Sequence, residues 1–171
     1  MPRLRRLTIP LLALVLAAAG AAAADPSLIA FRLKDQHDRL HTDARYRGAP
    51  LLVLWGDRKG ADVMRAWAPA LADSFAAEIA GYRLRLVQVA HGKGAPFFVK
   101  GKIKGSFRDP DTGPVLMDWD GVFAAAYAPE EDRVNAWLFD RDATLVATWR
   151  GAPGDSLPPA DLLAAARNLA R

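Results

Sequence analysis

The residues best placed to do chemistry form a short charged segment, Asp57-Arg58-Lys59, between an apolar run and an amphipathic one. The apolar run, residues 50–55, is typical of a buried strand, and the amphipathic run predicts a helix. A helix N-terminus presents unpaired N–H groups and a partial positive charge, so Arg58 and Lys59 could help to bind a carboxylate or a phosphate. The simpler interpretation is a solvated turn in which Asp57 or Asp62 caps the helix.

The three histidines are the other candidates for polar chemistry. His91 follows a second apolar run, residues 84–89, and ligands bind at the carboxyl ends of buried strands. We therefore count His91 as a candidate site residue, with a hydrogen-bonded rim residue as the alternative. His37 and His41 are four residues apart, a spacing that could hold a metal on a helix. The surrounding residues 34–48 instead predict a polar loop or short hairpin, so no metal site and no cofactor are predicted.

Thiol chemistry is excluded, because the chain contains no cysteine. Disulfide exchange and peroxide reduction through sulfur both need a thiolate. A binding surface remains possible in the segment from Lys93 to Arg108, which carries five cations beside Phe97, Phe98 and Phe107. Such a surface could bind an acidic partner. The favoured alternative is an amphipathic cover over a sheet, with its lysines pointing outward.

The N-terminal residues 1–24 have the pattern of a secretory signal peptide. Arg3, Arg5 and Arg6 precede an apolar run, and Ala22-Ala23-Ala24 offers a cleavage site. Without this segment the chain carries 20 Lys and Arg against 19 Asp and Glu, so its high pI of 9.7 comes largely from the signal. We therefore expect a periplasmic protein, a single domain over residues 25–171, with no membrane anchor after cleavage and no affinity for nucleic acid.

Alternating strand and helix patterns along residues 25–171 predict an α/β fold with a mixed sheet. Pro69 is expected to kink the long helix, and Gly81 to end it. Strands are expected at residues 29–33, 50–55, 84–89, 115–117, 136–139 and 144–149. Helices are expected at residues 61–80, 121–127 and 159–170, with a weaker helical pattern around residues 99–107.

The order of these segments resembles the redoxin group of the thioredoxin superfamily, which includes peroxiredoxin-like and TlpA-type periplasmic proteins. Four landmarks in their family order carry the resemblance, and they lie at residues 31–36, 51–55, 114–127 and 138–151. The resemblance implies a thioredoxin-like three-layer fold, a central mixed sheet flanked by helices.

The sequence departs from this family at its functional positions. The family carries a Cys-x-x-Cys at the helix start, with a proline five residues after the second cysteine. Counting back from Pro69 places these positions at Ala61 and Met64. The family's cis-proline would fall at or next to Asn135, where this chain has no proline. The resemblance thus implies a preserved frame that has lost its thiol chemistry.

These observations predict a non-catalytic periplasmic protein that binds a partner protein or a small anionic ligand. The predicted binding residues are Asp57, Arg58, Lys59, Asp62, His91 and Asn135, and no catalytic residue is predicted. One alternative is a cysteine-independent enzyme or metal-binding protein, with His37, His41 and His91 as its first candidate residues. Another is an accessory protein that docks a true thiol oxidoreductase.

Overall fold

The computed structural model describes residues 26–108 and 113–171, and the predicted signal peptide lies outside this part. Seven strands of the described chain form one sheet in the order β2-β1-β5-β4-β3-β6-β7. The strands are β1 (Arg32–Asp35), β2 (Leu40–Thr42), β3 (Leu51–Gly56), β4 (Arg85–His91), β5 (Val115–Asp118), β6 (Val134–Phe139) and β7 (Leu145–Gly151). The helices are α1 (Gly60–Ser74), α2 (Ala76–Ala80), α3 (Phe97–Gly105), α4 (Val122–Tyr127) and α5 (Ala160–Leu169), with a 3-10 helix η1 (Asp43–Tyr46).

The sheet is mixed, as the sequence predicts. β3, β4 and β5 run parallel, whereas β6 pairs with β3 in the antiparallel direction and β7 pairs with β6. β1 lies antiparallel to β5 and forms a hairpin with β2. Because β3 and β4 end at the same edge, the loops that follow them lie side by side.

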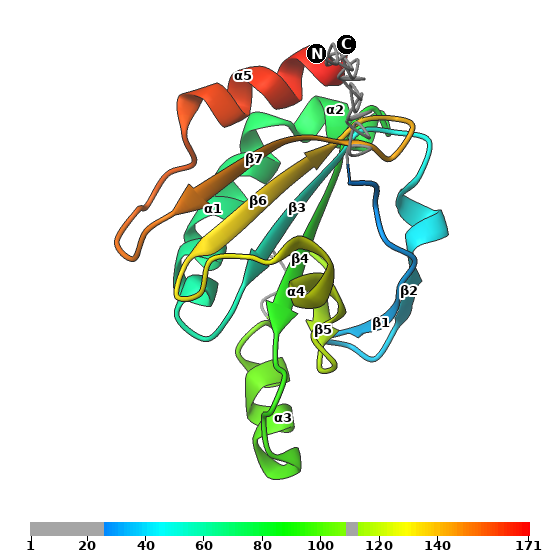
Figure 1. Cartoon of the computed structure of the whole chain (residues 1–171). Helices are drawn as coiled ribbons and strands as arrows, with labels where there is room; N and C mark the ends of the chain where they lie inside the picture. Colours follow the sequence, from blue (N-terminus) through cyan, green and yellow to red (C-terminus); the bar gives the residue numbers. More distant parts are fainter. Residues whose placement is uncertain (1–25, 109–112) are drawn as a thin grey trace, which may run out of the picture.

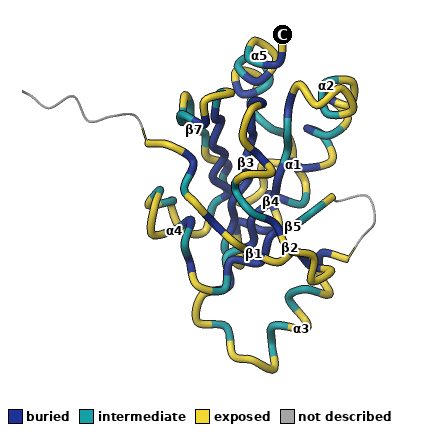
Figure 2. The backbone as a smooth tube through the Cα atoms, turned by 90° about the vertical axis from the view of Figure 1, so that its right-hand side faces the viewer, coloured by how far each residue is buried: buried dark blue, intermediate teal, exposed yellow. Residues whose placement is uncertain are grey.

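Side chains of the central strand β3 alternate between two hydrophobic clusters, one on each face of the sheet. Leu52 and Leu54 pack in the cluster that includes α1 and α5. Leu51, Val53 and Trp55 pack in the cluster that includes α4 and the hairpin side. The buried strands therefore lie between two outer layers (Figure 1 and Figure 2), which confirms the three-layer prediction.

The sequence predicts one long helix over residues 61–80, and the structure divides it into α1 and α2. α1 runs through Pro69 and ends at Ser74, and α2 begins at Ala76. The break is at Phe75, whose backbone is not helical and whose ring is 1% exposed. The guanidinium of Arg167 lies 5.4 Å from the centre of that ring. The break thus lies at a residue that packs into the core, six residues after Pro69.

The first strand begins later than predicted, at Arg32 instead of residue 29. The N–H of Ile29 donates to the hydroxyl of Tyr127 at 2.9 Å, and the N–H of Phe31 donates to Asp43 at 3.4 Å. Since these backbone groups bond to side chains, they do not form ladder bonds with a neighbouring strand.

Helix α3 does not cover the sheet, which contradicts the interpretation favoured above. It extends past the edge of the sheet (Figure 1), and none of its residues is buried. Ile103 and the following Phe107 contact the core, while Phe97 and Phe98 are 89% and 84% exposed. None of the helices in residues 26–108 and 113–171 is long and apolar enough to cross a membrane.

Candidate functional site

Asp57 follows β3 and organises the start of α1. One carboxylate oxygen accepts hydrogen bonds from the N–H groups of Lys59 at 3.0 Å and Gly60 at 2.9 Å. The other oxygen accepts from the N–H of Asp132 at 2.7 Å. Asp57 is therefore the cap of this turn, and it also ties the turn to the loop before β6. Asp62, the other predicted cap, is exposed and pairs with Arg65.

The start of α1 touches the entry of β6 through Gly60. A Cβ atom at this position would lie 2.1 Å from the carbonyl oxygen of Arg133, so only glycine allows this approach. This part of β6 is where the resemblance places the family's cis-proline, and the described residues contain no cis peptide bond. The start of α1 and the entry of β6, which carry the Cys-x-x-Cys and the cis-proline in the family that the sequence resembles, thus still lie in contact here. This chain has neither the cysteines nor the cis-proline.

Asn135 shapes the loop before β6 and does not line the cleft described next. Its side-chain oxygen accepts from the N–H of Glu130 at 3.0 Å, and its Nδ2 donates to the carbonyl of Glu130 at 2.9 Å. The side chain is 2% exposed. We assign Asn135 a structural part in this turn, and its predicted binding role stays a prediction.

A cleft of about 620 Å³ opens at the carboxyl ends of β3 and β4, and we call it the β3–β4 cleft. Asp57, Arg58 and His91 all line it, so the structure brings these three predicted residues together. Arg65 and Lys93 add two further cations. Its apolar lining residues are Ala61, Ala90, Ala95, Pro96, Val99, Ile103 and Phe107.

Lys59 and Asp62 lie outside the β3–β4 cleft. Lys59 Nζ lies 2.6 Å from Asp132 Oδ2, so its charge is paired within the loop. Both residues line a separate groove beside the turn at Pro153 and Gly154. Arg58, in contrast, is exposed and makes no ion pair with a described residue. The unpaired cations of the cleft are therefore Arg58 and Lys93, because Arg65 pairs with Asp62.

His91 ends β4 and is held by its neighbours on the sheet edge. Its ring centre lies 5.2 Å from that of Trp55. On the other flank, a Cβ at Gly121 would lie 3.0 Å from His91 Cε1, and Gly121 has a φ of +74° that suits glycine. The Nδ1 atom of His91 is buried and has no hydrogen-bond partner in the described chain.

A second polar centre lies in the hairpin, where the sequence predicts only a polar loop or short hairpin. His41 Nδ1 lies 2.6 Å from the hydroxyl of Tyr46, and His41 Nε2 lies 3.1 Å from Asp35 Oδ2. All three side chains are buried. Burial raises the pKa of Tyr46 to about 12. Burial opposes ionisation of Asp35, but its hydrogen bonds to Arg39, His41 and His37 outweigh this and lower its pKa to about 2.

This hairpin centre places His41 apart from His91, two of the residues named in the metal alternative. Both ring nitrogens of His41 face protein partners, and His91 lies at the end of another strand. The described residues contain no group of three or more side chains that could hold a metal ion. The three histidines are therefore not brought together.

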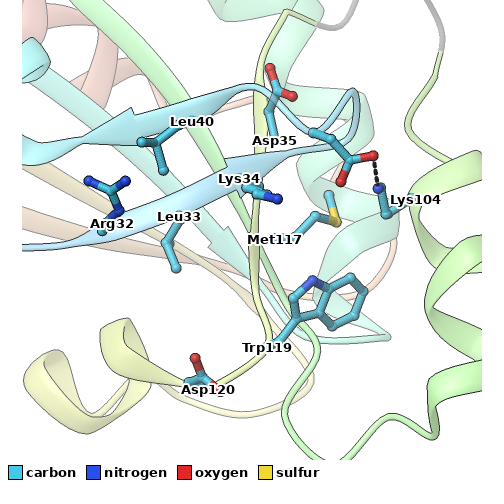
Figure 3. A pocket seen from close by; sticks show the side chains of 10 residues that line it. Arg32, Leu33, Lys34, Asp35, Leu40, Lys104, Met117, Trp119 and Asp120 are labelled. Atoms are coloured by element: carbon cyan, nitrogen blue, oxygen red, sulfur yellow. Dashed lines mark hydrogen bonds and ion pairs between the residues drawn. The ribbon is translucent and has the colours of Figure 1, made fainter.

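The pocket beside the hairpin is smaller and of mixed charge (Figure 3). Its volume is about 300 Å³, and Lys104 Nζ lies 2.5 Å from Asp38 Oδ2 at its side. Its charged lining residues are Arg32, Lys34, Lys104, Asp35, Asp38 and Asp120. Because three cations face three acids, this pocket offers no preference for a charged ligand.

Similar proteins were found by comparing structures and not by comparing sequences. No protein-family model matches the sequence, and no curated protein is significantly similar to it. The exposed lipoprotein thioredoxin of Streptococcus pneumoniae superposes with a TM-score of 0.63 at 18% identity, covering 82% of this chain and 100% of its own. Peroxiredoxin Q of Xanthomonas campestris gives 0.60 at 13% identity, covering 86% and 100%.

A third similar structure is BsSco, a member of the Sco family of cytochrome c oxidase assembly proteins. Its TM-score is 0.62 at 16% identity, and 85% of this chain and 94% of BsSco are covered. This chain has the thioredoxin-like fold. At such low identities the likeness shows the fold alone, and the predicted fold class is confirmed.

The thioredoxin-like frame holds no thiol where the resemblance places the family's cysteines. Ala61 contributes a methyl group to the wall of the β3–β4 cleft. Met64 is fully buried in the core cluster between the sheet and α1. Neither side chain can form the thiolate that disulfide exchange or peroxide reduction requires. The protein therefore has this fold without the thiol chemistry that the resemblance associates with it.

Proposed function

We propose that this protein is an exported, non-catalytic accessory protein that binds an acidic segment of a partner protein in the β3–β4 cleft. The observation that carries the proposal is a cleft with apolar walls and three cations, at the edge where the resemblance places the family's reactive cysteines. Thiol chemistry is absent here while a cavity remains.

The charge and exposure of α3 favour a protein segment as the ligand. Residues 93–108 contain five cations and no acid. Phe97 and Phe98 are exposed at the start of α3, directly after the cleft residues Ala95 and Pro96. An exposed aromatic pair beside an apolar, cationic cleft suits a segment with alternating acidic and apolar side chains.

Two observations support export. Residues 1–24 have the pattern of a signal peptide. The similar Streptococcus structure is, by its name, an exposed lipoprotein. Fractionation of cells that express the full chain tests this part, and we expect the shortened protein in the periplasmic fraction.

A defined peptide pair tests the binding proposal. We expect a labelled peptide of alternating aspartate and leucine to bind at least tenfold more tightly than one of lysine and leucine, and salt should weaken the binding. Arg58→Glu and the double variant Phe97→Ser, Phe98→Ser should each weaken it. The matched control is Leu157→Ser, which removes an exposed apolar side chain outside the cleft lining.

Three outcomes would overturn this proposal. Equal binding of both peptides would remove the charge argument. Turnover of peroxide or reduction of a disulfide by the purified chain alone would contradict the non-catalytic assignment. Stoichiometric metal in protein purified without an affinity tag would favour the metal-binding alternative.

A further inference from the structure

One side of helix α3 is bare. Five residues follow one another along it at spacings of three and four, and they are Phe97, Phe98, Gly101, Lys102 and Gly105. Such spacings place residues on the same side of a helix. All five are exposed, and at Gly101 and Gly105 no atom outside the helix's own backbone lies within 4 Å of the Cβ position. We call these five residues the outer face of α3.

The opposite side of α3 attaches the helix to the rest of the molecule. Ile103 packs against the core. Lys100 Nζ lies 5.0 Å from the centre of the Trp119 ring, and Lys104 Nζ lies 2.5 Å from Asp38 Oδ2. Because these contacts hold one side of the helix, the outer face is turned away from the sheet and is left to meet a partner.

The charge around the outer face is positive. Residues 93–108 contain five cations and no acid. Lys93 and Lys102 are exposed and make no ion pair within the described part of the chain. The nearly neutral net charge of residues 25–171 gives no reason to expect affinity for a membrane, because it averages over this local excess. Exposed aromatic rings beside lysines are typical of helices that lie on anionic bilayers.

The size of the outer face favours a bilayer over a protein partner. A helix of nine residues is about 14 Å long and about 10 Å wide, far less than the roughly 800 Å² that each side of a stable protein interface buries. A second copy of α3 would bring cations against cations, which repel. A bilayer needs no such area, because insertion of a few apolar side chains adds to the electrostatic attraction. Since α3 extends past the edge of the sheet (Figure 1), a flat surface can approach it.

We propose that the outer face of α3 docks the protein on an anionic lipid bilayer, with Phe97 and Phe98 inserted below the headgroups and Lys102 among them. The helix lies on the membrane and is too short to cross it. This inference goes beyond the proposed function, and these three residues do not line the β3–β4 cleft. Because other residues of α3 do line the cleft, docking would hold the cleft close to the bilayer.

Sedimentation with sucrose-loaded vesicles tests the proposal. The protein used is residues 25–171, which contain all of the described structure, because the apolar run in residues 1–24 would itself enter a bilayer. One set of vesicles is phosphatidylcholine alone, and the other contains about 30% phosphatidylglycerol as the anionic lipid. We expect the partition coefficient to be at least about tenfold higher on the anionic vesicles, and about 0.5 M NaCl to remove most of this difference.

Two variants separate insertion from charge. The double variant Phe97→Ser, Phe98→Ser should lower the partition coefficient on anionic vesicles at least about tenfold, and its matched control Leu157→Ser, an exposed apolar residue outside α3, should not change it. Lys102→Glu should lower it at least about fivefold. The control Arg141→Glu reverses an exposed charge in the turn before β7 and should have little effect. All these positions are exposed, and circular dichroism checks that each variant is folded.

Absence of binding to either kind of vesicle, or equal binding to both, would overturn the inference. Unchanged binding of the double phenylalanine variant would overturn it too, because no ring would then be inserted. A dimer in sedimentation equilibrium that this variant dissociates would assign the outer face to a second copy and overturn it as well. Arg58→Glu should weaken the acidic peptide and leave vesicle binding unchanged, whereas Lys102→Glu should do the reverse. Failure of this inference and failure of the proposed function are therefore distinguishable.

Discussion

Two groups of buried polar side chains lie in this sheet, and they differ in how their hydrogen bonds are satisfied. In the hairpin, Asp35 accepts four hydrogen bonds, and both ring nitrogens of His41 have partners. At the ends of β3 and β4, Trp55 and His91 each keep a buried nitrogen without a described partner. The first group is complete without a ligand, and the second group is not. Completeness of hydrogen bonding therefore separates a structural polar centre from a candidate binding site.

The largest expected effect comes from breaking the complete group. Asp35→Ala leaves His41, Arg39 and two backbone N–H groups without their acceptor, so we expect the free energy of unfolding to fall by about 3–5 kcal/mol. Urea denaturation followed by circular dichroism measures it. The control Asp62→Ala removes an exposed ion pair and should change stability by less than about 0.5 kcal/mol. A loss below about 1 kcal/mol in Asp35→Ala would show that this centre does not hold the hairpin.

A smaller loss in the free energy of unfolding is expected at Gly60, where the start of α1 contacts the entry of β6. Gly60→Ala would place a Cβ 2.1 Å from the Arg133 carbonyl oxygen, so we expect a loss of about 1–3 kcal/mol in the same assay. Gly101 is the matched control, since it lies inside α3 and no atom outside its own helix backbone lies within 4 Å of its Cβ position. Gly101→Ala should be neutral or raise stability by up to about 1 kcal/mol. Equal effects at the two glycines would contradict the close contact between α1 and the entry of β6.

The strands and helices with clear periodicity were predictable from the sequence. The continuous apolar run at residues 50–55 predicts β3, and the spacing of Leu162, Leu163 and Ala166 predicts α5. The break at Phe75 was not predictable, because Phe75 continues the apolar spacing of the helix and its contact with Arg167 joins distant parts of the chain. The exposure of α3 was missed for the same kind of reason. Its apolar spacing is helical, but only its C-terminal end reaches the core.

The candidate site was predictable only in part. Asp57, Arg58 and His91 were found because polar residues that follow buried strands meet at one sheet edge. Trp55 was missed, because a tryptophan in an apolar run normally indicates core, and its unpartnered N–H is visible only in three dimensions. His41 was assigned to a polar loop, although Asp35 and Tyr46 allow it to be buried. Hydrogen bonds between side chains at such spacings do not produce a hydrophobic period in the sequence, so they cannot be predicted from it.

Low pH should weaken the hydrogen-bonded group in the hairpin, because it protonates Asp35. The pKa of Asp35 is about 2 in the folded protein against an ordinary value of 3.8, so its stabilising effect is present above about pH 4 and is lost as the pH falls toward 2. We expect the stability advantage of the wild type over Asp35→Asn to shrink across this range. Urea denaturation at about pH 6, 4 and 2.5 measures the difference. A constant advantage at all three values would mean that the carboxylate of Asp35 is not the stabilising form.

The smallest effect tests the incomplete group directly, through two buried tryptophans. Trp67 is fully buried, and its Nε1 donates to the carbonyl of Asp155 at 3.2 Å, whereas Trp55 Nε1 has no partner in the described chain. Replacing either residue by phenylalanine removes a similar volume, but only Trp67→Phe also removes a hydrogen bond. We therefore expect Trp67→Phe to lose about 1 kcal/mol more in the free energy of unfolding. If Trp55→Phe costs as much, the Trp55 N–H is already satisfied in solution by a bound water.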